Sequence, residues 1–404
     1  MTPDSPHVLR LPSFLHFLSS RALSSVAFQG SAVAIGWLIY DRTRNPFDLG
    51  LVGLFQFLPM LILTFVAGQM ADQFDRRRIG LVCQVVEAAV MGFIALGVWQ
   101  GWLPTWGIFV AVAVLGAAQA FERPTMAALL PGIVPAAQLQ SAVATSTSVM
   151  QTALIIGPAI GGVLYGLGPV APFLVSGLLF LVASYNVLAI ERPATLPART
   201  PITFESVFAG VAFIKSKPVM LGTISLDLFA VLLGGATALL PVYARDILNA
   251  GPWGLGFLRM APAVGAVAMS LVLARYPLQH RVGMKMLWAV GIFGAATIVF
   301  AYSTNIALSV LMLVILGASD TVSVVVRSSL VQLLTPDHMR GRVNAVNSLF
   351  IGTSNQLGEF ESGIVAGLIG PVAAVAFGGI GTIAIVLIWA RLFPALRRVD
   401  KLTG

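Results

Sequence analysis

The sequence predicts an all-α membrane protein with twelve transmembrane helices in two similar bundles of six. Composition is the first observation, because 57% of the 404 residues are hydrophobic and only 10% are charged, with a mean hydropathy of +0.91. Soluble domains do not have such a composition. The second observation is the recurrence of apolar stretches of about 20 residues, the length that crosses a bilayer as a helix. The third is an internal repeat over about half the chain.

Each apolar stretch is bounded by short polar or charged connections, and we expect one spanning helix per stretch. In the first half the expected spans are 12–39, 47–71, 79–100, 105–130, 139–166 and 170–190. In the second half they are 219–243, 252–275, 284–302, 305–331, 343–368 and 371–394.

The repeat relates the two halves at a nearly constant offset. Tyr40 matches Tyr243, and Arg123 matches Arg327, each within a similar local sequence. Such repetition is typical of two parallel bundles related by an axis along the membrane normal. The expected parts are an N-terminal bundle at 1–190, a cytoplasmic linker with a short amphipathic helix at 191–217, and a C-terminal bundle at 218–404.

Lysine and arginine are concentrated in the connections of one side. The basic residues expected on that side are Arg10, Arg76–Arg78, Arg192, Arg199, Lys215, Lys217, Arg275, Arg281, Lys285, Arg340, Arg342, Arg397, Arg398 and Lys401, against Arg42, Arg44 and Arg245 on the other. Short cytoplasmic loops carry this excess. We therefore expect both termini in the cytoplasm and the chain in the cytoplasmic (inner) membrane.

The most charged connection is Gly68–Arg78, between the second and third predicted spans. It contains Asp72, Asp75 and three consecutive arginines. One interpretation is a hairpin that only sets the orientation of the chain. The other is a loop that acts as a conformational gate, with Gly68, Asp72, Asp75, Arg76, Arg77, Glu122 and Arg123 as its members. Glu122 would then meet the arginines, the alternative being that Glu122 and Arg123 form a pair that reaches the membrane interface.

The spacing Gly68-x-x-x-Asp72, followed by Asp75-Arg76-Arg77, resembles the loop between helices two and three of the major facilitator superfamily, although Gln73 and Asp75 depart from the family pattern. The Asp75-Arg76-Arg77 form is similar to the enterobactin-exporter branch of drug and siderophore efflux antiporters. Further similar stretches are Phe121-Glu122-Arg123-Pro124, Leu240-Pro241-Val242-Tyr243-Ala244 and Pro336-Asp337-His338-Met339-Arg340-Gly341-Arg342-Val343.

The segment Gly157-Pro158-x-x-Gly161-Gly162 resembles the helix-five motif of exporters in the same superfamily. Its small residues allow two helices to approach closely, and Pro158 removes one helical hydrogen bond. The resemblance implies an antiporter whose interface is tightly closed to ions. Ordinary packing of small residues is the alternative.

Ionisable residues within the spans cost at least ~2.5 kcal/mol each on insertion scales, so each requires a partner or a function. The candidates for proton coupling or substrate binding are Asp227, Arg259, Glu361, Glu359, Asp320 and Arg327. The resemblance places Asp227 on a helix that lines the cavity, which makes it the first candidate; a hydrogen-bonded structural aspartate is the alternative.

The helical positions suggest partners for the other charged residues in the spans. Arg259 needs a carboxylate, which Asp227, Glu359 or Glu361 could supply. Glu359 and Glu361 are two residues apart and cannot both face the cavity. Arg327 is two turns from Asp320, too far for easy pairing, so we expect it to contact the inner loops. Glu87 is expected to be structural.

The predicted function is secondary active export of a small amphipathic molecule, siderophore-like or drug-like, by alternating access and in exchange for protons. The alternatives are a transporter of lipid or lysolipid between leaflets and a non-transporting membrane sensor. Expected partners are the substrate, protons and membrane lipids, with a monomeric chain and no nucleic acid. The sequence shows no nucleotide-binding loop, no metal-binding His/Cys set and one cysteine, Cys83, so we expect no enzyme activity, catalytic residue, cofactor or metal.

The charged loop leads to a first prediction. Asp72→Asn is expected to slow transport while substrate binding and expression stay near wild type, because the carboxylate would serve a conformational step and not the binding site. Turnover and equilibrium binding of the reconstituted protein measure the two effects separately. Wild-type turnover would contradict the gating role.

Overall fold

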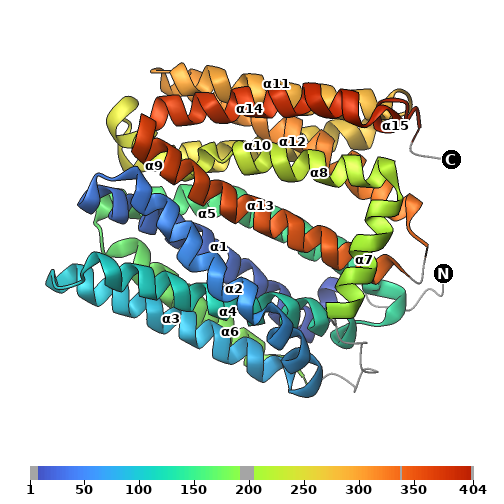
Figure 1. Ribbon diagram of the computed structural model, residues 1–404. Helices are drawn as coiled ribbons and strands as arrows, with labels where there is room; N and C mark the ends of the chain where they lie inside the picture. Colours follow the sequence, from blue (N-terminus) through green and yellow to red (C-terminus); the bar gives the residue numbers. More distant parts are fainter. Residues whose placement is uncertain (1–7, 192–203, 337–338, 402–404) are drawn as a thin grey trace. The chain divides into compact units, whose positions relative to one another are not determined.

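The computed structural model of the protein describes residues 8–191, 204–336 and 339–401. Within these ranges the chain is helical and contains no strand (Figure 1). The surroundings of several residues inside helices are also outside the description, and these residues include Gly68 and Asp72 of the predicted gating loop.

Contacts divide the chain into two compact units. The first comprises Met1–Arg42 and Phe55–Pro201, and the second Thr43–Leu54 and Ile202–Gly404. The beginning of the second helix therefore belongs to the second unit. The predicted bundle boundaries at 190 and 218 stay a prediction.

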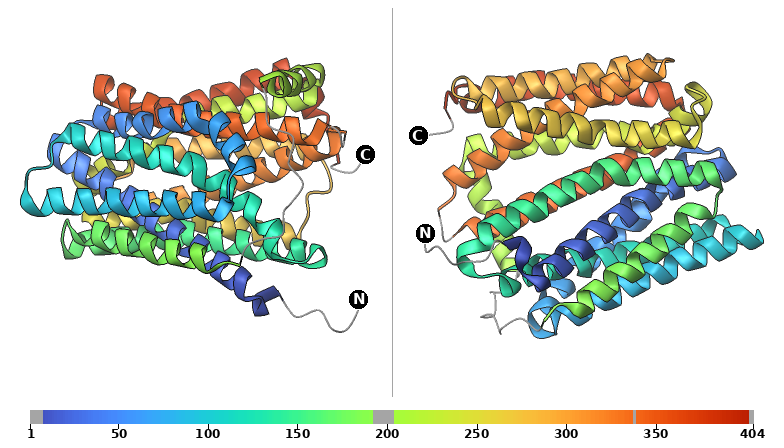
Figure 2. Two further views of the ribbon diagram at one scale, coloured as in Figure 1. Left: turned by 90° about the horizontal axis from the view of Figure 1, so that it is seen from below. Right: turned by 180° about the vertical axis from the view of Figure 1, so that it is seen from behind.

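The first unit contains most of six long helices that lie within a few residues of the predicted spans. They are α1 (Pro12–Thr43), α2 (Pro46–Gln73), α3 (Arg76–Gln100), α4 (Thr105–Ile133), α5 (Leu139–Leu167) and α6 (Ala171–Ala189). Short 3-10 turns precede α1 at Val8–Arg10 and α5 at Ala136–Gln138. Helix α3 packs against both α4 and α6, as the two further views also show (Figure 2).

The second unit contains the remaining long helices. They are α8 (Pro218–Leu233), α10 (Gly251–Arg275), α11 (Val282–Tyr302), α12 (Ile306–Leu334), α13 (Arg340–Ile369) and α14 (Pro371–Leu392), with the short α7 (Phe204–Ser216), α9 (Leu240–Val242) and α15 (Pro394–Arg397). Helix α11 packs against α12 and α14, and α8 packs against α13 and α14. The pairs that α11 forms with α12 and α14 repeat those that α3 forms with α4 and α6.

The seventh predicted span, expected as one helix over 219–243, is interrupted in the structure. Helix α8 ends at Leu233, and a 3-10 turn at Ala236–Leu239, the short α9 and a π-helix at Tyr243–Ile247 follow. Two consecutive glycines, Gly234 and Gly235, lie at the break. Glycine lowers the stability of a helix interior. A methyl group on Gly234 would also lie 2.8 Å from the Phe293 ring. A non-helical backbone at membrane depth is typical where it is buried in protein or lines a cavity.

The predicted helix of the linker is present as α7, and its residues face two environments. Ile214 is buried among residues that include Val343 and Val346 of α13, and a methyl group on Gly210 would lie 2.9 Å from the Arg342 carbonyl oxygen. Phe208 is 70% exposed. One side of α7 thus packs on α13, and Phe208 remains available to a membrane surface.

Within the described residues, eleven helices are long and apolar enough to cross a membrane. Helix α13 is not among them, although it has 30 residues. Its sequence includes three asparagines, one glutamine and two glutamates, which lower its apolar character. Helix α13 carries Glu359, so some of its polar residues lie at the candidate site.

Close helix contacts at glycine repeat in the two units. A methyl group on Gly116 of α4 would lie 3.0 Å from the Cα of Gln56 of α2, and one on Gly317 of α12 would lie 2.6 Å from the Cα of Pro262 of α10. Small residues let helix backbones approach in this way, and packing of this kind holds helices together in lipid. The repetition of the contact supports the relation between the two halves.

Gly317→Val is therefore expected to lower the free energy of unfolding by about 1–3 kcal/mol, because the added methyl groups would overlap the α10 backbone. Unfolding of the purified protein in detergent measures the change. Gly291→Val on α11 is the matched control, since a methyl group there would have no neighbour within 4 Å. Equal stability of the two variants would contradict the proposed packing.

Candidate functional site

A cavity of about 280 Å³ lies in the second unit, beside the interruption that follows α8. Its wall includes the two glycines of that break, apolar side chains of α10 and α11, and polar groups from α12 and α13. The lining residues are Val231, Gly234, Gly235, Thr237, Pro262, Ala263, Ala266, Phe293, Leu316, Gly317, Asp320, Asn355 and Glu359.

Two carboxyl groups reach this cavity. Asp320 comes from the middle of α12, and Glu359 comes from α13, one turn beyond Asn355. Asp320 has neither an ion pair nor a hydrogen bond within the described part of the chain. Because a charge without a partner is costly in a desolvated place, Asp320 is the group whose protonation can depend on what the cavity contains.

Asp227, the first candidate from the sequence, forms an ion pair with Arg327 of α12. Both side chains are almost inaccessible to solvent, with exposed fractions of 7% and 4%. Asp227 also lines a small void, together with Ser319 and Asp320. The expectation that Arg327 contacts the inner loops was wrong, because the guanidinium instead points into the bundle at Asp227.

Arg259 and Glu359 act on one another electrostatically. Of the three carboxylates expected to serve Arg259, the structure thus favours Glu359. Glu361 accepts a hydrogen bond from Ser362 at 3.4 Å and is not part of the cavity wall. The two glutamates of α13 face different surroundings, as their spacing requires.

Glu122 has contacts other than those expected for a gate. Its carboxylate accepts hydrogen bonds from Ser24 at 3.1 Å, Gln84 at 2.9 Å and Gln119 at 2.9 Å. Among the described contacts it therefore faces α1 and α3, and the contact expected with the Arg76–Arg78 cluster stays a prediction. Arg123, the next residue, donates to the Gln119 side-chain oxygen at 3.0 Å.

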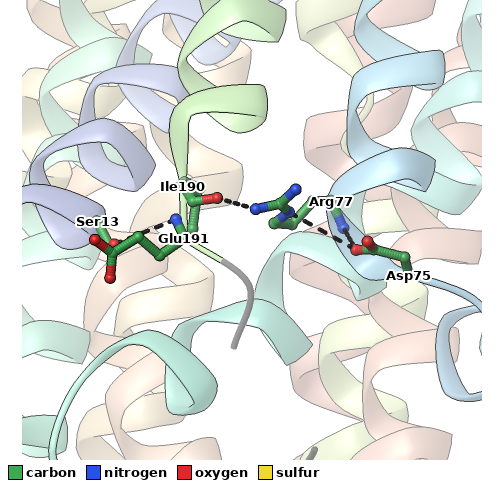
Figure 3. A network of polar contacts seen from close by, with 5 residues as sticks. All are labelled: Ser13, Asp75, Arg77, Ile190 and Glu191. Carbon is green, nitrogen blue, oxygen red and sulfur yellow. Dashed lines mark hydrogen bonds and ion pairs between the residues drawn. The ribbon is translucent and has the colours of Figure 1, made fainter. Parts of the chain in front are cut away.

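The arginines of the predicted gating loop bind backbone carbonyl groups. Arg76 donates to Ala128 at 3.0 Å, and Arg77 donates to Ile190 at the end of α6 (Figure 3). Asp75 begins α3 as its N-cap, with its carboxylate accepting from the Arg77 backbone N–H at 3.0 Å. Such a cap stabilises the first turn of a helix, and the Arg77 contact ties that turn to α6.

The helix-five glycines make the close contact that their size suggests. A methyl group on Gly157 of α5 would lie 2.6 Å from the Gln29 side chain of α1, and one on Gly161 would lie 2.7 Å from the Cα of Gly30. Gly162 and Pro158 are also buried within α5. The segment therefore holds α5 against α1 within the first unit.

A larger cavity of about 480 Å³ lies near the connection between α10 and α11 and the end of the chain, lined in part by His280 and Lys401. Asp400 beside it accepts hydrogen bonds from the Arg281 backbone N–H and from His280, which lower the pKa of this exposed carboxyl. Among the described residues of its wall, no carboxyl group comes from a spanning helix. We therefore regard the smaller cavity as the candidate site.

Sequence analysis did not identify Phe293, Asn355 or the break at Gly234 as parts of the site. The Gly234-Gly235 pair was the available signal, because interrupted helices in transporters occur at binding sites. Asn355 lies one turn before Glu359, and this spacing places the two side chains on one face of a helix.

The long apolar helices and the internal repeat define a multi-pass membrane protein with the fold of the major facilitator transporters. Among solved structures, a bacterial homologue of the human lysosomal transporter Spinster, inward-facing and occupied, has a TM-score of 0.75 at 13% identity and covers 98% of both chains. A bacterial homologue of the iron transporter ferroportin has a TM-score of 0.72 at 17% identity, over 98% of this chain and all of that one. At these identities the likeness shows the fold alone.

The chain belongs to the transmembrane secretion effector family, whose model matches residues 7–402. It is 26% identical to the multidrug efflux pump Tap of Mycobacterium tuberculosis over 408 residues, covering 97% of this chain and 95% of the pump. It is 24% identical to the enterobactin exporter EntS of Escherichia coli over 406 residues, covering 96% and 93%. It is thus a membrane transporter of the major facilitator type, as the sequence predicted.

The ion pair in the second unit leads to a stability prediction. Asp227→Asn is expected to lower the free energy of unfolding by about 3–5 kcal/mol, because Arg327 would remain buried without its counter-charge. The double variant Asp227→Asn with Arg327→Gln should recover much of that loss. Unfolding in detergent is the measurement.

Asp246→Asn is the control for this experiment, because its pair with Arg44 is exposed and such pairs contribute about 0–1 kcal/mol. An additive double variant, or a loss no larger than that of the control, would show that Asp227 and Arg327 are not coupled.

Proposed function

We propose that this protein is a secondary active transporter that exports small amphipathic molecules in exchange for protons. The observation that carries the proposal is Asp320, a carboxyl without a described partner in the wall of a largely apolar cavity. The names of the relatives, a multidrug efflux pump and an enterobactin exporter, support the direction of transport and the class of substrate.

Exchange follows from a single carboxyl that serves two ligands. In an empty, dry cavity the ionised form of Asp320 is disfavoured, so the group takes up a proton. A cationic substrate favours the ionised form and displaces that proton. Substrate and proton then occupy the same site alternately, which couples their movements in opposite directions.

The charges around the cavity also bear on substrate choice. Arg327 is neutralised by Asp227, and Arg259 is opposed by Glu359, so Asp320 contributes an unbalanced negative charge when it is ionised. The remaining wall is apolar apart from groups such as Asn355 and Thr237. This chemistry favours a drug-like amphipathic cation over an acidic siderophore. At 280 Å³ the cavity is slightly smaller than typical drug-binding pockets of about 300–1,000 Å³.

Alternating access requires a helix contact that can open. The first turns of α2 approach α13 within the second unit, where a methyl group on Gly50 would lie 3.0 Å from the Cα of Gly363. Gly53 lies beside Glu359 in the same way, since a methyl group added to Gly53 would lie 3.1 Å from the Glu359 carboxylate. We propose that this smooth glycine contact separates during transport, and that Asp72 contributes to the same change. We further propose an inner-membrane location with both termini in the cytoplasm.

Asp320→Asn is expected to abolish accumulation of substrate driven by a pH gradient while downhill movement continues, because an amide cannot exchange a proton. Proteoliposomes with an acidic interior and external ethidium, a fluorescent amphipathic cation, measure both activities. Glu361→Gln is the comparison, since that side chain is outside the cavity wall and should leave the accumulation unchanged.

Full accumulation by Asp320→Asn would rule out Asp320 as the coupling group. If accumulation were instead lost in Asp227→Asn or in Glu361→Gln, the carboxyl replaced in that variant would carry the proton. If neither the wild-type protein nor any of the variants moved ethidium, the proposal of a drug-like substrate would be contradicted.

A further inference from the structure

The first unit contains a buried polar cluster that the proposed exchange does not use. Six side chains from α1, α3 and α4 form it, and they are Ser20, Ser24, Gln84, Glu87, Gln119 and Glu122. Two carboxyl groups are thus enclosed among two neutral amides and two hydroxyl groups. Buried carboxyl groups at membrane depth are costly unless each is paired or protonated.

Glu122 is well supplied with hydrogen-bond donors. One oxygen accepts from Ser24 at 3.1 Å and from Gln84 at 2.9 Å, and the other accepts from Gln119 at 2.9 Å. Three donors on two oxygens stabilise the charged form of such a group.

Glu87 has the opposite surroundings. Its exposed fraction is 0%, and one oxygen accepts a single hydrogen bond from Gln119 at 2.5 Å. The other oxygen is buried without a partner within the described part of the chain. Because Gln119 donates to both glutamates, an ionised Glu87 would place two carboxylates on one amide. The arrangement leaves Glu87 with less stabilisation of charge than Glu122.

The charged and titratable groups around Glu87 come from the helices packed on α3. Helix α1 contributes Arg21, which interacts with Glu122, and His16, which contacts Asn186 of α6 at 2.9 Å. Helix α3 itself contributes Cys83. Helix α4 contributes Arg123, whose guanidinium binds the Gln119 oxygen and lies 5.8 Å from the Phe28 ring centroid. Gln119 thus stands between this guanidinium and the Glu87 carboxyl.

We propose that Glu87 is a second proton-binding site of the transporter, protonated at neutral pH and linked through Gln119 to Glu122 and Arg123. Protonation forms an O–H bond on the oxygen that lacks a partner, and deprotonation returns the proton to water and leaves a second negative charge on the cluster. Binding of the proton follows from the cluster alone; only its use in transport rests on the proposed exchange function.

Stability measurements test the protonation state directly. Glu87→Gln replaces a neutral carboxylic acid by a neutral amide of the same shape, so its melting temperature at neutral pH should match wild type. Glu122→Gln, the matched variant in the same cluster, should lower the melting temperature, because it removes a charge that three donors and Arg21 stabilise. A fall with Glu87→Gln as large as that with Glu122→Gln would overturn the proposal, because Glu87 would then be an ionised partner of Arg123.

Infrared spectroscopy of the purified full-length protein in detergent supplies a second readout. The carbonyl band of a protonated carboxylic acid should be present in wild type and weaker in Glu87→Gln. The part of the band that Glu87 contributes should disappear at alkaline pH. Glu191→Gln, at an exposed position outside the spans, should leave the band unchanged. An identical band in wild type and Glu87→Gln would overturn the proposal.

Neither readout requires transport, so the two proposals can fail independently. If the band decreases in Glu87→Gln and Asp320→Asn still shows full pH-driven accumulation, Glu87 is a proton site and Asp320 is not the coupling group. If the band is unchanged in Glu87→Gln and Asp320→Asn loses accumulation, Asp320 is the coupling group and Glu87 is not a proton site.

Discussion

A charge within a membrane-spanning bundle must have a counter-charge, hydrogen-bond donors or a proton, and the polar interior of this protein follows from that requirement. In the second unit Asp227 neutralises Arg327, and Arg259 interacts with Glu359. Asp320 is left without a described partner and lines a cavity. The paired groups hold helices together, whereas the unpaired group can bind and release a ligand. The energetic cost of burying a charge thus underlies both the pairing of these helices and the proposed function.

Close contacts at glycine determine where that cavity lies. Gly235 and Gly358 bring α8 and α13 together, since a methyl group on Gly358 would lie 2.8 Å from the Val231 carbonyl oxygen. The helix is interrupted at the same place, and the interruption supplies part of the cavity wall. Lipid gives helices no hydrophobic reason to associate, so small residues that permit close packing matter more here than in soluble proteins. A site between helices can then form where that packing is broken.

The sequence predicted the fold and the helix positions to within a few residues, because hydrocarbon permits few backbone structures and their length is set by bilayer thickness. The partners of the buried charges were predicted less well. Periodicity shows which residues share a helix face, but not which helix that face meets, so Arg327 was expected at the inner loops, whereas it pairs with Asp227. Asp227 was ranked first because the resemblance placed it on a helix that lines the cavity. Glu87 was expected to be structural, and its surroundings depend on Gln119, 32 residues away.

The central claim, that substrate and protons cross in opposite directions, is tested most directly by counting protons during substrate movement. Wild-type proteoliposomes with a trapped pH indicator and no initial pH gradient would receive external ethidium. The account predicts that the interior becomes alkaline as ethidium enters, because each entering cation displaces a proton that leaves, and that protein-free vesicles show no such change. Entry of ethidium at the same rate with a constant internal pH would contradict exchange and indicate a transporter without proton coupling.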